Sequence, residues 1–274
     1  DRNGRFKARL EGETQGNVLL RQAQWRRVED AAFALDSAKA FIAGKLRNSR
    51  QVLLRGARES KVPEEAAQLT RAAQNLAASL RTLKSMDTLD GARGVEGEAA
   101  RGYFSVLPLL LRADLREDFR MDGRSRRPPL DRFNALLSFL YSMLTNDCRS
   151  ACEAAGLDPQ AGFLHALRPG RAALALDLME EFRPLLADRL ALSLVNRGQL
   201  KASDFDLRLG GAVQLHDDAR KTVIVAYQER KQEEITHPLL DQKGPLGIMP
   251  HTQARVLARI IRGDGEGYLP FLSR

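Results

Sequence analysis

The chain has 274 residues, of which 43% are hydrophobic, and apolar periodicity persists along almost all of it, so the sequence can build a substantial core and bulk disorder is excluded. Leu and Ala dominate the apolar residues and only 6% are aromatic, which favours helices over sheets. The net charge is +8, and 34 of the 43 basic residues are arginine. This excess indicates a polyanionic partner, although a high-GC genome would enrich arginine and alanine together without one.

The first predicted element is a short strand, Arg5–Leu10, followed by a turn. A lone strand can neither bury one face nor satisfy its edges. We therefore expect the sequence to begin partway through a β-rich unit whose earlier strands are absent.

From there on, amphipathic patterns predict a mainly α-helical protein. The predicted helices span residues 22–54, 64–85, 95–111, 132–155, 172–196 with a perturbation at Pro184, 218–234 and 252–261. Residues 207–215 predict a small hairpin, and residues 112–130 and 236–250 predict loops. The first of these loops carries Arg124, Arg126 and Arg127 and is interpreted as a mobile basic loop.

Two cysteines, Cys148 and Cys152, lie four residues apart in a helical pattern. This spacing puts both thiols on one helix face, and two cysteines cannot make a four-thiolate zinc site. We interpret them as reduced thiols of a cytoplasmic protein. No apolar run approaches 18 residues and no signal peptide is visible, so we expect no membrane association.

The stretch HALRPGRAALALDLMEEFRP, residues 165–184, combines a helical pattern with three acids. At 100° per residue its leucines fall on one arc, whereas Asp177, Glu180 and Glu181 fall on the opposite arc, which is typical of a solvated acidic face. Alternatively, Asp177 and Glu180 are three residues apart and can converge on one cation. Periodicity alone favours the solvated face.

A histidine, His165, precedes these acids, and the Pro169-Gly170 turn keeps it off the same helix. A connector that doubles back would place its imidazole over the acidic face. One imidazole with two carboxylates suits Mn²⁺ or Mg²⁺ better than a closed zinc site. The ordinary alternative is a connector histidine that bonds to a carbonyl.

A further acid, Glu96, lies between Gly94 and Gly97 in a helical run. Each glycine costs about 1 kcal/mol there relative to alanine, which indicates close approach of a backbone or a ligand. Glu98, two residues on, faces elsewhere and is the natural control.

Together these segments resemble one family, the CRISPR-associated endonuclease-integrases of spacer acquisition (the Cas-one family). The similar segments are GVEGEAARGY at 94–103, NALLSFLYSMLT at 134–145, GFLHALRPGRAALALDLMEEFRP at 162–184, QERK at 228–231 and HPLL at 237–240. The segments match in order and spacing, and the resemblance covers nearly the whole chain. Their sequences are most similar to the type I-C branch.

The resemblance implies a β-rich amino-terminal domain followed by a large helical catalytic domain. We accordingly divide the chain into residues 1–20, a remnant of the amino-terminal β domain with its linker, and residues 21–274, the helical catalytic domain. It also implies that Glu96, His165 and Glu180 are the catalytic metal ligands, with Asp177 as a further ligand, direct or through water. Glu181 and Glu98 match no ligand position and are predicted to be surface acids.

By the same resemblance, the expected activity is insertion of captured DNA into a CRISPR array, in which a 3′-hydroxyl attacks a phosphodiester in the presence of Mn²⁺ or Mg²⁺. Water in place of the hydroxyl gives endonuclease activity. The implied partners are double-stranded DNA as prespacer and repeat, a second copy in a homodimer, the small second adaptation protein in a heterohexamer, and a Cas-four-like exonuclease. Because dimerisation in the family uses the amino-terminal domain, assembly of this chain is an open question.

The substrate should be held mainly by electrostatic contacts. The expected phosphate contacts are Arg168 and Arg171, which flank the Pro-Gly turn, and the loop arginines Arg124, Arg126 and Arg127. Tyr103 and Tyr141 are expected to pack rather than to stack on bases.

Two other functions fit the same residues. One is a non-catalytic helical nucleic-acid-binding scaffold whose acidic face is merely solvated. The other is a metal-dependent DNase without an integration role.

Overall fold

The computed structural model describes residues 18–273, and its amino-terminal part is a pair of helices, α1 (Val18–Glu29) and α2 (Ala31–Glu59). The sequence predicted one helix here. The break falls at Asp30, whose extended backbone and side chain, which accepts a hydrogen bond from the Phe33 amide at 3.1 Å, make it the N-cap of α2. The predicted strand Arg5–Leu10, and with it most of the proposed β remnant, lies outside the described residues.

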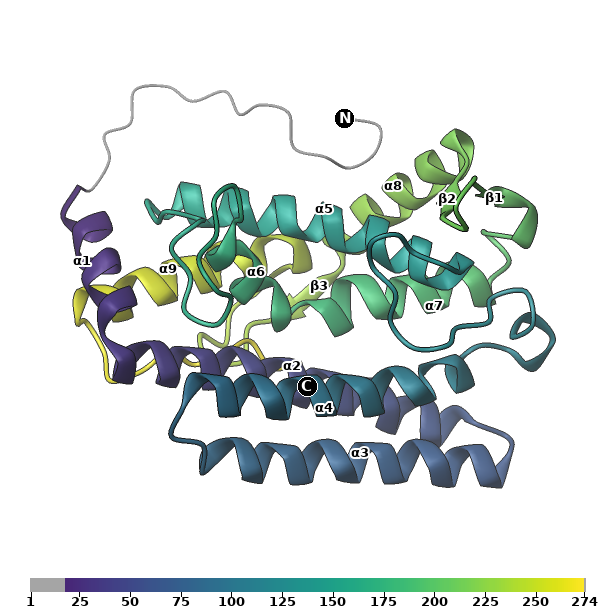
Figure 1. Ribbon diagram of the computed structural model, residues 1–274, viewed down its shortest axis with the longest axis horizontal. Coiled ribbons are helices and arrows are strands. Elements are labelled where there is room, and N and C mark those ends of the chain that lie inside the picture. The colour runs from purple at the N-terminus through teal and green to yellow at the C-terminus, as the bar shows by residue number, and fades with distance from the viewer. Residues whose placement is uncertain (1–17, 274) are drawn as a thin grey trace.

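Helices α3 (Pro63–Lys84) and α4 (Leu89–Val106) pack against α2 and form a layer of long, roughly parallel rods with it (Figure 1). Pro63 opens α3 at a position where no amide donor is needed, and two acids follow in the first turn. Thr88 caps α4 by accepting from the Gly91 amide at 3.2 Å. This layer carries the predicted ligand Glu96 on α4.

The second layer is built around α5 (Arg132–Ala154). This helix packs against α6 (Ala173–Glu180) and α9 (Met249–Arg262). Asp131 caps α5 by accepting from the Asn134 amide at 2.7 Å, and Gly156 follows its end with φ +80°, as the sequence predicted. Two short 3₁₀ turns, Leu107–Leu110 and Ala113–Leu115, and then a loop connect α4 to α5.

The predicted helix over residues 172–196 is three pieces: α6 (Ala173–Glu180), a π-helical turn Arg183–Asp188, and α7 (Arg189–Asn196). The irregularity surrounds Pro184, which cannot donate a backbone hydrogen bond, so the perturbation expected there is confirmed.

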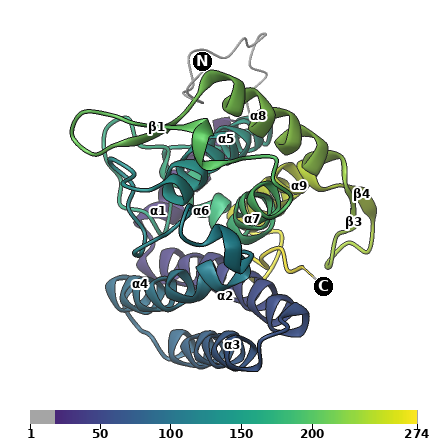
Figure 2. The ribbon, with the colours of Figure 1, turned by 90° about the vertical axis from the view of Figure 1, so that its right-hand side faces the viewer.

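The remaining elements follow α7 along the chain, and all but the last of them, which packs against α5, lie on the outside of the second layer (Figure 2). They are the antiparallel hairpin of β1 (Phe205–Leu207) and β2 (Val213–Leu215), then α8 (Asp217–Gln232), the hairpin of β3 (Glu234–Thr236) and β4 (Lys243–Pro245), a 3₁₀ turn Leu246–Ile248, and α9 (Met249–Arg262). The β3–β4 hairpin corrects the loop predicted for residues 236–250. The mainly α fold class is confirmed.

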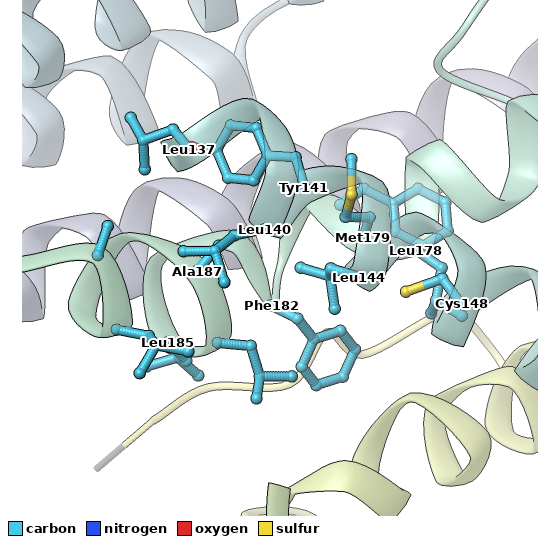
Figure 3. Packing of buried hydrophobic residues seen from close by; sticks show 14 of the residues in the cluster. Leu137, Leu140, Tyr141, Leu144, Cys148, Leu178, Met179, Phe182, Leu185 and Ala187 are labelled. Carbon is cyan, nitrogen blue, oxygen red and sulfur yellow. The ribbon is translucent and has the colours of Figure 1, made fainter. Parts of the chain in front are cut away.

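The core lies between α5 and the segment from α6 to the π-helical turn (Figure 3). Leu140, Leu144, Leu178 and Phe182 are completely buried there, and each such side chain stabilises the fold by about 1.5–3 kcal/mol. Cys148 is also completely buried and is a free thiol, as is Cys152. Among residues 18–273, no helix is long and apolar enough to cross a membrane.

The acidic side of α6 is not solvated. Asp177, Glu180 and Glu181 are all buried, so the solvated face favoured by periodicity is wrong, and so is the prediction that Glu181 is a surface acid. The helix wheel is wrong for Glu181, which at 100° per residue lies within about 20° of Leu174, and right for Asp177 and Glu180 on the acidic side. It could not show that other segments cover that side. Glu98 is exposed, as predicted.

The cover over Glu181 is the carboxy-terminal segment. Its carboxylate accepts hydrogen bonds from the Tyr268 hydroxyl, the Phe271 amide and the Gln253 side chain, the last at 3.3 Å. Asn48 of α2 reinforces this contact, because its side-chain amide donates to the carbonyls of Glu181 and Phe271, both at 2.8 Å. Burial nevertheless raises the pKa of Glu181 to about 8, against the opposing effect of the three donors.

A pH series tests this buried carboxyl. Folded Glu181 stays protonated between its ordinary pKa of 4.5 and about 8, whereas the unfolded chain loses the proton, so its contribution to stability is complete below pH 4.5 and is lost as pH rises to about 8. We expect the stability difference between wild type and Glu181→Gln to shift towards the variant over this window, by up to about 1.4 kcal/mol per pH unit. Urea unfolding at several pH values measures it. The exposed control Glu98→Gln should show a flat difference, and a flat difference for Glu181→Gln would contradict the account.

Candidate functional site

The connector between α5 and α6 folds back over α6 because of one carboxylate. Asp177 accepts hydrogen bonds from three consecutive backbone amides, those of Phe163 at 2.6 Å, Leu164 at 2.9 Å and His165 at 2.9 Å. The chain comes so close that a Cβ at Gly162 would lie 2.7 Å from Asp177 Oδ2, so this position needs glycine. The connector that doubles back, expected from the sequence, is therefore what the structure has.

The same carboxylate orients the imidazole of His165. Nδ1 lies 2.7 Å from Asp177 Oδ1, which accepts, so Nδ1 carries the proton and Nε2 presents its lone pair. Nε2 lies 3.8 Å from Glu180 Oε1, and the His165 side chain is 18% exposed. Asp177 thereby accepts four hydrogen bonds and positions the His165 ring, and its role as a further ligand stays a prediction. A metal-binding histidine usually donates the N–H of its other ring nitrogen to a carboxylate or carbonyl in this way.

The carboxylate of Glu180 is buried between two cations. Arg183 approaches Oε1 at 3.0 Å, and the Lys45 ammonium of α2 lies 2.8 Å from Oε2. Burial alone would raise the pKa of Glu180, but the charges of Arg183 and Lys45 prevail and lower it to about 2. Glu180 is thus an ionised carboxylate held inside the protein at neutral pH.

The third predicted ligand, Glu96, reaches the same place from α4. Its carboxylate contacts the Lys45 ammonium, so Glu96 and Glu180 share one cationic partner. Burial opposes the charged form of Lys45, yet the two carboxylates raise its pKa. Glu96 and Glu180 therefore flank the Lys45 ammonium, and His165 Nε2 lies 3.8 Å from the other oxygen of Glu180.

The donor set fits a divalent cation. Glu180 Oε2 is buried, and the Lys45 ammonium lies 2.8 Å from it. Two carboxylates and one imidazole are oxygen and nitrogen ligands suited to Mn²⁺ or Mg²⁺. In the described part of the chain no three acids, histidines or cysteines already lie close enough together to hold a metal ion.

The glycines beside Glu96 leave the site open. A Cβ built on Gly94 or Gly97 would meet no atom within 4 Å, so neither glycine serves packing inside this chain. Glu96 is correspondingly the most accessible of the three, with its side chain 25% exposed. The open surface beside Glu96 is where a substrate can approach.

The arginines predicted to contact phosphate separate into two kinds. Arg126, Arg127 and Arg168 are exposed, and their charges together with burial lower the pKa of Arg171, so the loop and the Pro-Gly turn lie close together. No ion pair within residues 18–273 involves these four. They form a basic cluster next to His165.

Arg124 belongs to the fold instead. Its guanidinium donates to Asn134 Oδ1 at 2.6 Å and Ser138 Oγ at 3.1 Å, and lies 5.2 Å from the ring centre of Tyr141. Tyr141 and Tyr103 are buried and donate to Asp188 at 2.6 and 3.0 Å, so both pack, as predicted.

Two charged residues of the site escaped the sequence analysis, Lys45 and Arg183. A signal existed for Lys45, which stands between buried Phe41 and Leu46 on the apolar face of a helical pattern, where a lysine needs a partner. Arg183 is three residues after Glu180, the spacing of a helical ion pair.

The hydrogen bond between Asp177 and His165 can be observed directly. We expect a slowly exchanging Nδ1 proton of His165 in ¹⁵N-correlated NMR spectra of the wild type at neutral pH, and its loss in Asp177→Asn, whose amide cannot accept from all four donors. His251, on α9, is the internal control and should not change. A His165 ring protonated only on Nε2 would contradict the geometry.

Comparison with known proteins agrees with this architecture. The family model described as "CRISPR associated protein Cas1" matches residues 1–229. "CRISPR-associated endonuclease Cas1 1" of Moorella thermoacetica is 56% identical over the whole chain, which spans 80% of that relative, and "CRISPR-associated endonuclease Cas1" of Leptospira interrogans is 47% identical over 93% of this chain and 99% of its own.

Among solved structures, a partial "Cas6-RT-Cas1--Cas2 complex" superposes with a TM-score of 0.82 at 26% identity, over the whole chain and 80% of the other. A "Casposase bound to integration product" reaches 0.80 at 22% identity, over 98% of this chain and 75% of that one, and shares the fold. The family model and the identity to the curated relatives together show that the chain belongs to the CRISPR-associated Cas1 family.

Proposed function

We propose that the chain is a divalent-metal-dependent DNA endonuclease and integrase that joins captured DNA to a CRISPR array. The observation that carries this proposal is that Glu96 and Glu180 share one cation, the Lys45 ammonium, while Glu180 is held ionised with His165 Nε2 3.8 Å from its Oε1. The relatives named as endonucleases, and the casposase bound to an integration product, support the reaction class.

In this proposal Glu96, Glu180 and His165 Nε2 hold Mn²⁺ or Mg²⁺, which when bound supplies Lewis acidity to a phosphodiester. Asp177 fixes the His165 ring and, in the neutral imidazole, places the proton on Nδ1 and the lone pair on Nε2. The attacking group comes from the DNA: its 3′-hydroxyl forms the new bond to phosphorus as the bond to the leaving oxygen breaks. Tyr103 and Tyr141 are buried donors to Asp188, and burial raises the pKa of each well above its usual range, so neither serves as a nucleophile.

The basic cluster of Arg126, Arg127, Arg168 and Arg171 holds the DNA backbone beside these ligands. Guanidinium groups bind phosphate bidentately, and here four of them come from two loops that flank the site. Arg124 contributes only by shaping the loop.

We also propose that the chain assembles with partners of the kinds found in complexes and fusions of its relatives. The complexes that contain Cas2, and the Cas4–Cas1 fusions of Rhodospirillum rubrum and Geobacter sulfurreducens at 38% identity, support a small Cas2-like partner and a Cas4-like exonuclease. We also propose that the chain forms a homodimer, lies in the cytoplasm and belongs to the type I-C subtype. The subtype rests only on the sequences of the motifs.

A strand-transfer assay tests the ligand set. We expect Glu96→Gln, His165→Ala and Glu180→Gln each to reduce joining in Mn²⁺ by at least about 100-fold, because each removes a ligand, while DNA binding changes little. Glu98→Gln, on the same helix and exposed, should retain wild-type joining. Equal losses for Glu96→Gln and Glu98→Gln would refute the assignment.

The same assay separates the alternatives. A donor that ends in a dideoxynucleotide should abolish joining while cutting of the target by water continues. If a donor with an ordinary 3′-hydroxyl gave cut target DNA but no joined product, this result would favour a DNase without an integration role. Normal DNA binding without any metal-dependent reaction would favour a scaffold.

Salt titration tests the basic cluster. We expect replacement of Arg126, Arg127, Arg168 and Arg171 by alanine to make the dependence of log K on log salt shallower by about 2–4, because each phosphate contact contributes about 0.9. The control is Arg262→Ala. Arg262 is an exposed arginine at the end of α9 and pairs with Asp264. An unchanged slope in the fourfold variant would remove the cluster from the DNA contact surface.

A further inference from the structure

The ammonium of Lys45 lies between two of the three predicted ligands, Glu96 and Glu180. It contacts Glu96, lies 2.8 Å from Glu180 Oε2, and belongs to a side chain that is only 9% exposed. Lysine is rarely buried unless it is paired, and here both partners are the carboxylates assigned to the metal. The two carboxylates proposed to bind the metal, those of Glu96 and Glu180, therefore already pair with a cation of the chain itself.

The charges at this centre balance without any further ion. Glu96 and Glu180 carry two negative charges, and Lys45 and Arg183 carry two positive charges. A divalent cation on the same oxygens would lie a few ångströms from the Lys45 ammonium, away from bulk water, where like charges repel strongly. The ammonium and the divalent ion therefore cannot both occupy this position.

Of the two internal cations, Lys45 is the one that can leave. Arg183 is buried and its guanidinium lies 4.7 Å from the ring centre of Tyr141, which holds the planar group in place. Lys45 has a flexible four-carbon stem, and the surface beside Glu96 is open, since nothing lies within 4 Å of a Cβ at Gly94 or Gly97.

We propose that Lys45 is a built-in counter-ion that competes with the divalent metal for Glu96 and Glu180. Its ammonium holds the two carboxylates together before the metal binds and leaves them when the metal arrives. This inference rests on the proposed metal site and adds that the chain itself sets the metal affinity. Lys45 acts here as a positioning residue.

A metal titration tests the competition. We expect Lys45→Met to bind Mn²⁺ at least about tenfold more tightly than wild type, measured from the free-Mn²⁺ signal in electron paramagnetic resonance, because the competing charge is gone. The metal-induced rise in melting temperature should be larger in this variant. Lys39→Met, on the same helix but away from the carboxylates, should bind as wild type does.

Lysine labelling gives a second measurement that needs no variant. In wild type, reductive methylation read by mass spectrometry should spare Lys45 without metal and modify it in saturating Mg²⁺, while Lys39 reacts equally in both. If wild type binds Mn²⁺ but Lys45→Met binds it no more tightly, or if Lys45 stays protected in Mg²⁺, the counter-ion inference is wrong and the metal site stands. If neither protein binds Mn²⁺, both proposals are overturned.

Discussion

Three carboxylates within five residues of one short segment are buried, and none of them can remain inside the protein without hydrogen-bond donors or cations. Each recruits a different part of the chain. Asp177 holds the connector through three amides, Glu180 binds Lys45 of α2 and Arg183, and Glu181 binds the carboxy-terminal segment. Through Lys45, Glu180 also reaches Glu96 on α4. The assembly of the site is therefore inseparable from the hydrogen bonds and ion pairs that satisfy these three buried carboxyl groups.

This constraint explains why the site lies between the two helical layers. α4 belongs to the layer of α2 and α3, whereas α6 belongs to the layer around α5 (Figures 1 and 2). A reacting centre at such a boundary is rigid, because α2 packs against α4, α6 and the π-helical turn at once. It is also accessible from one side, beside Glu96, where the basic cluster lies close to His165.

Much of the fold was predictable because its determinants are local. The helix α5 has an apolar stripe, a capping aspartate and a terminal glycine with positive φ, and all three signals agree with its observed ends. The β3–β4 hairpin was missed because its strands have three residues each and one ends in proline, which leaves no alternation to detect. The split at Asp30 was missed because the apolar pattern continues across it.

The ligand candidates came from motifs and from the resemblance, whereas their surroundings depend on contacts between distant segments. Only the tertiary structure brings Tyr268 and Phe271 over Glu181, a contact that no helix wheel can show. Lys45 is 51 residues from Glu96, and no spacing rule connects positions on separate helices. For the same reason Arg124 resembled its loop neighbours in sequence, yet it is bound by Asn134 and Ser138 of α5.

The most direct test of the central claim is a crystal structure of the protein soaked in Mn²⁺, with anomalous diffraction recorded at the manganese edge. The account predicts a single strong peak within coordination distance of Glu96, Glu180 and His165 Nε2, with the Lys45 ammonium moved away from the carboxylates. A peak bound elsewhere, or saturating Mn²⁺ with Lys45 still between Glu96 and Glu180, would contradict it.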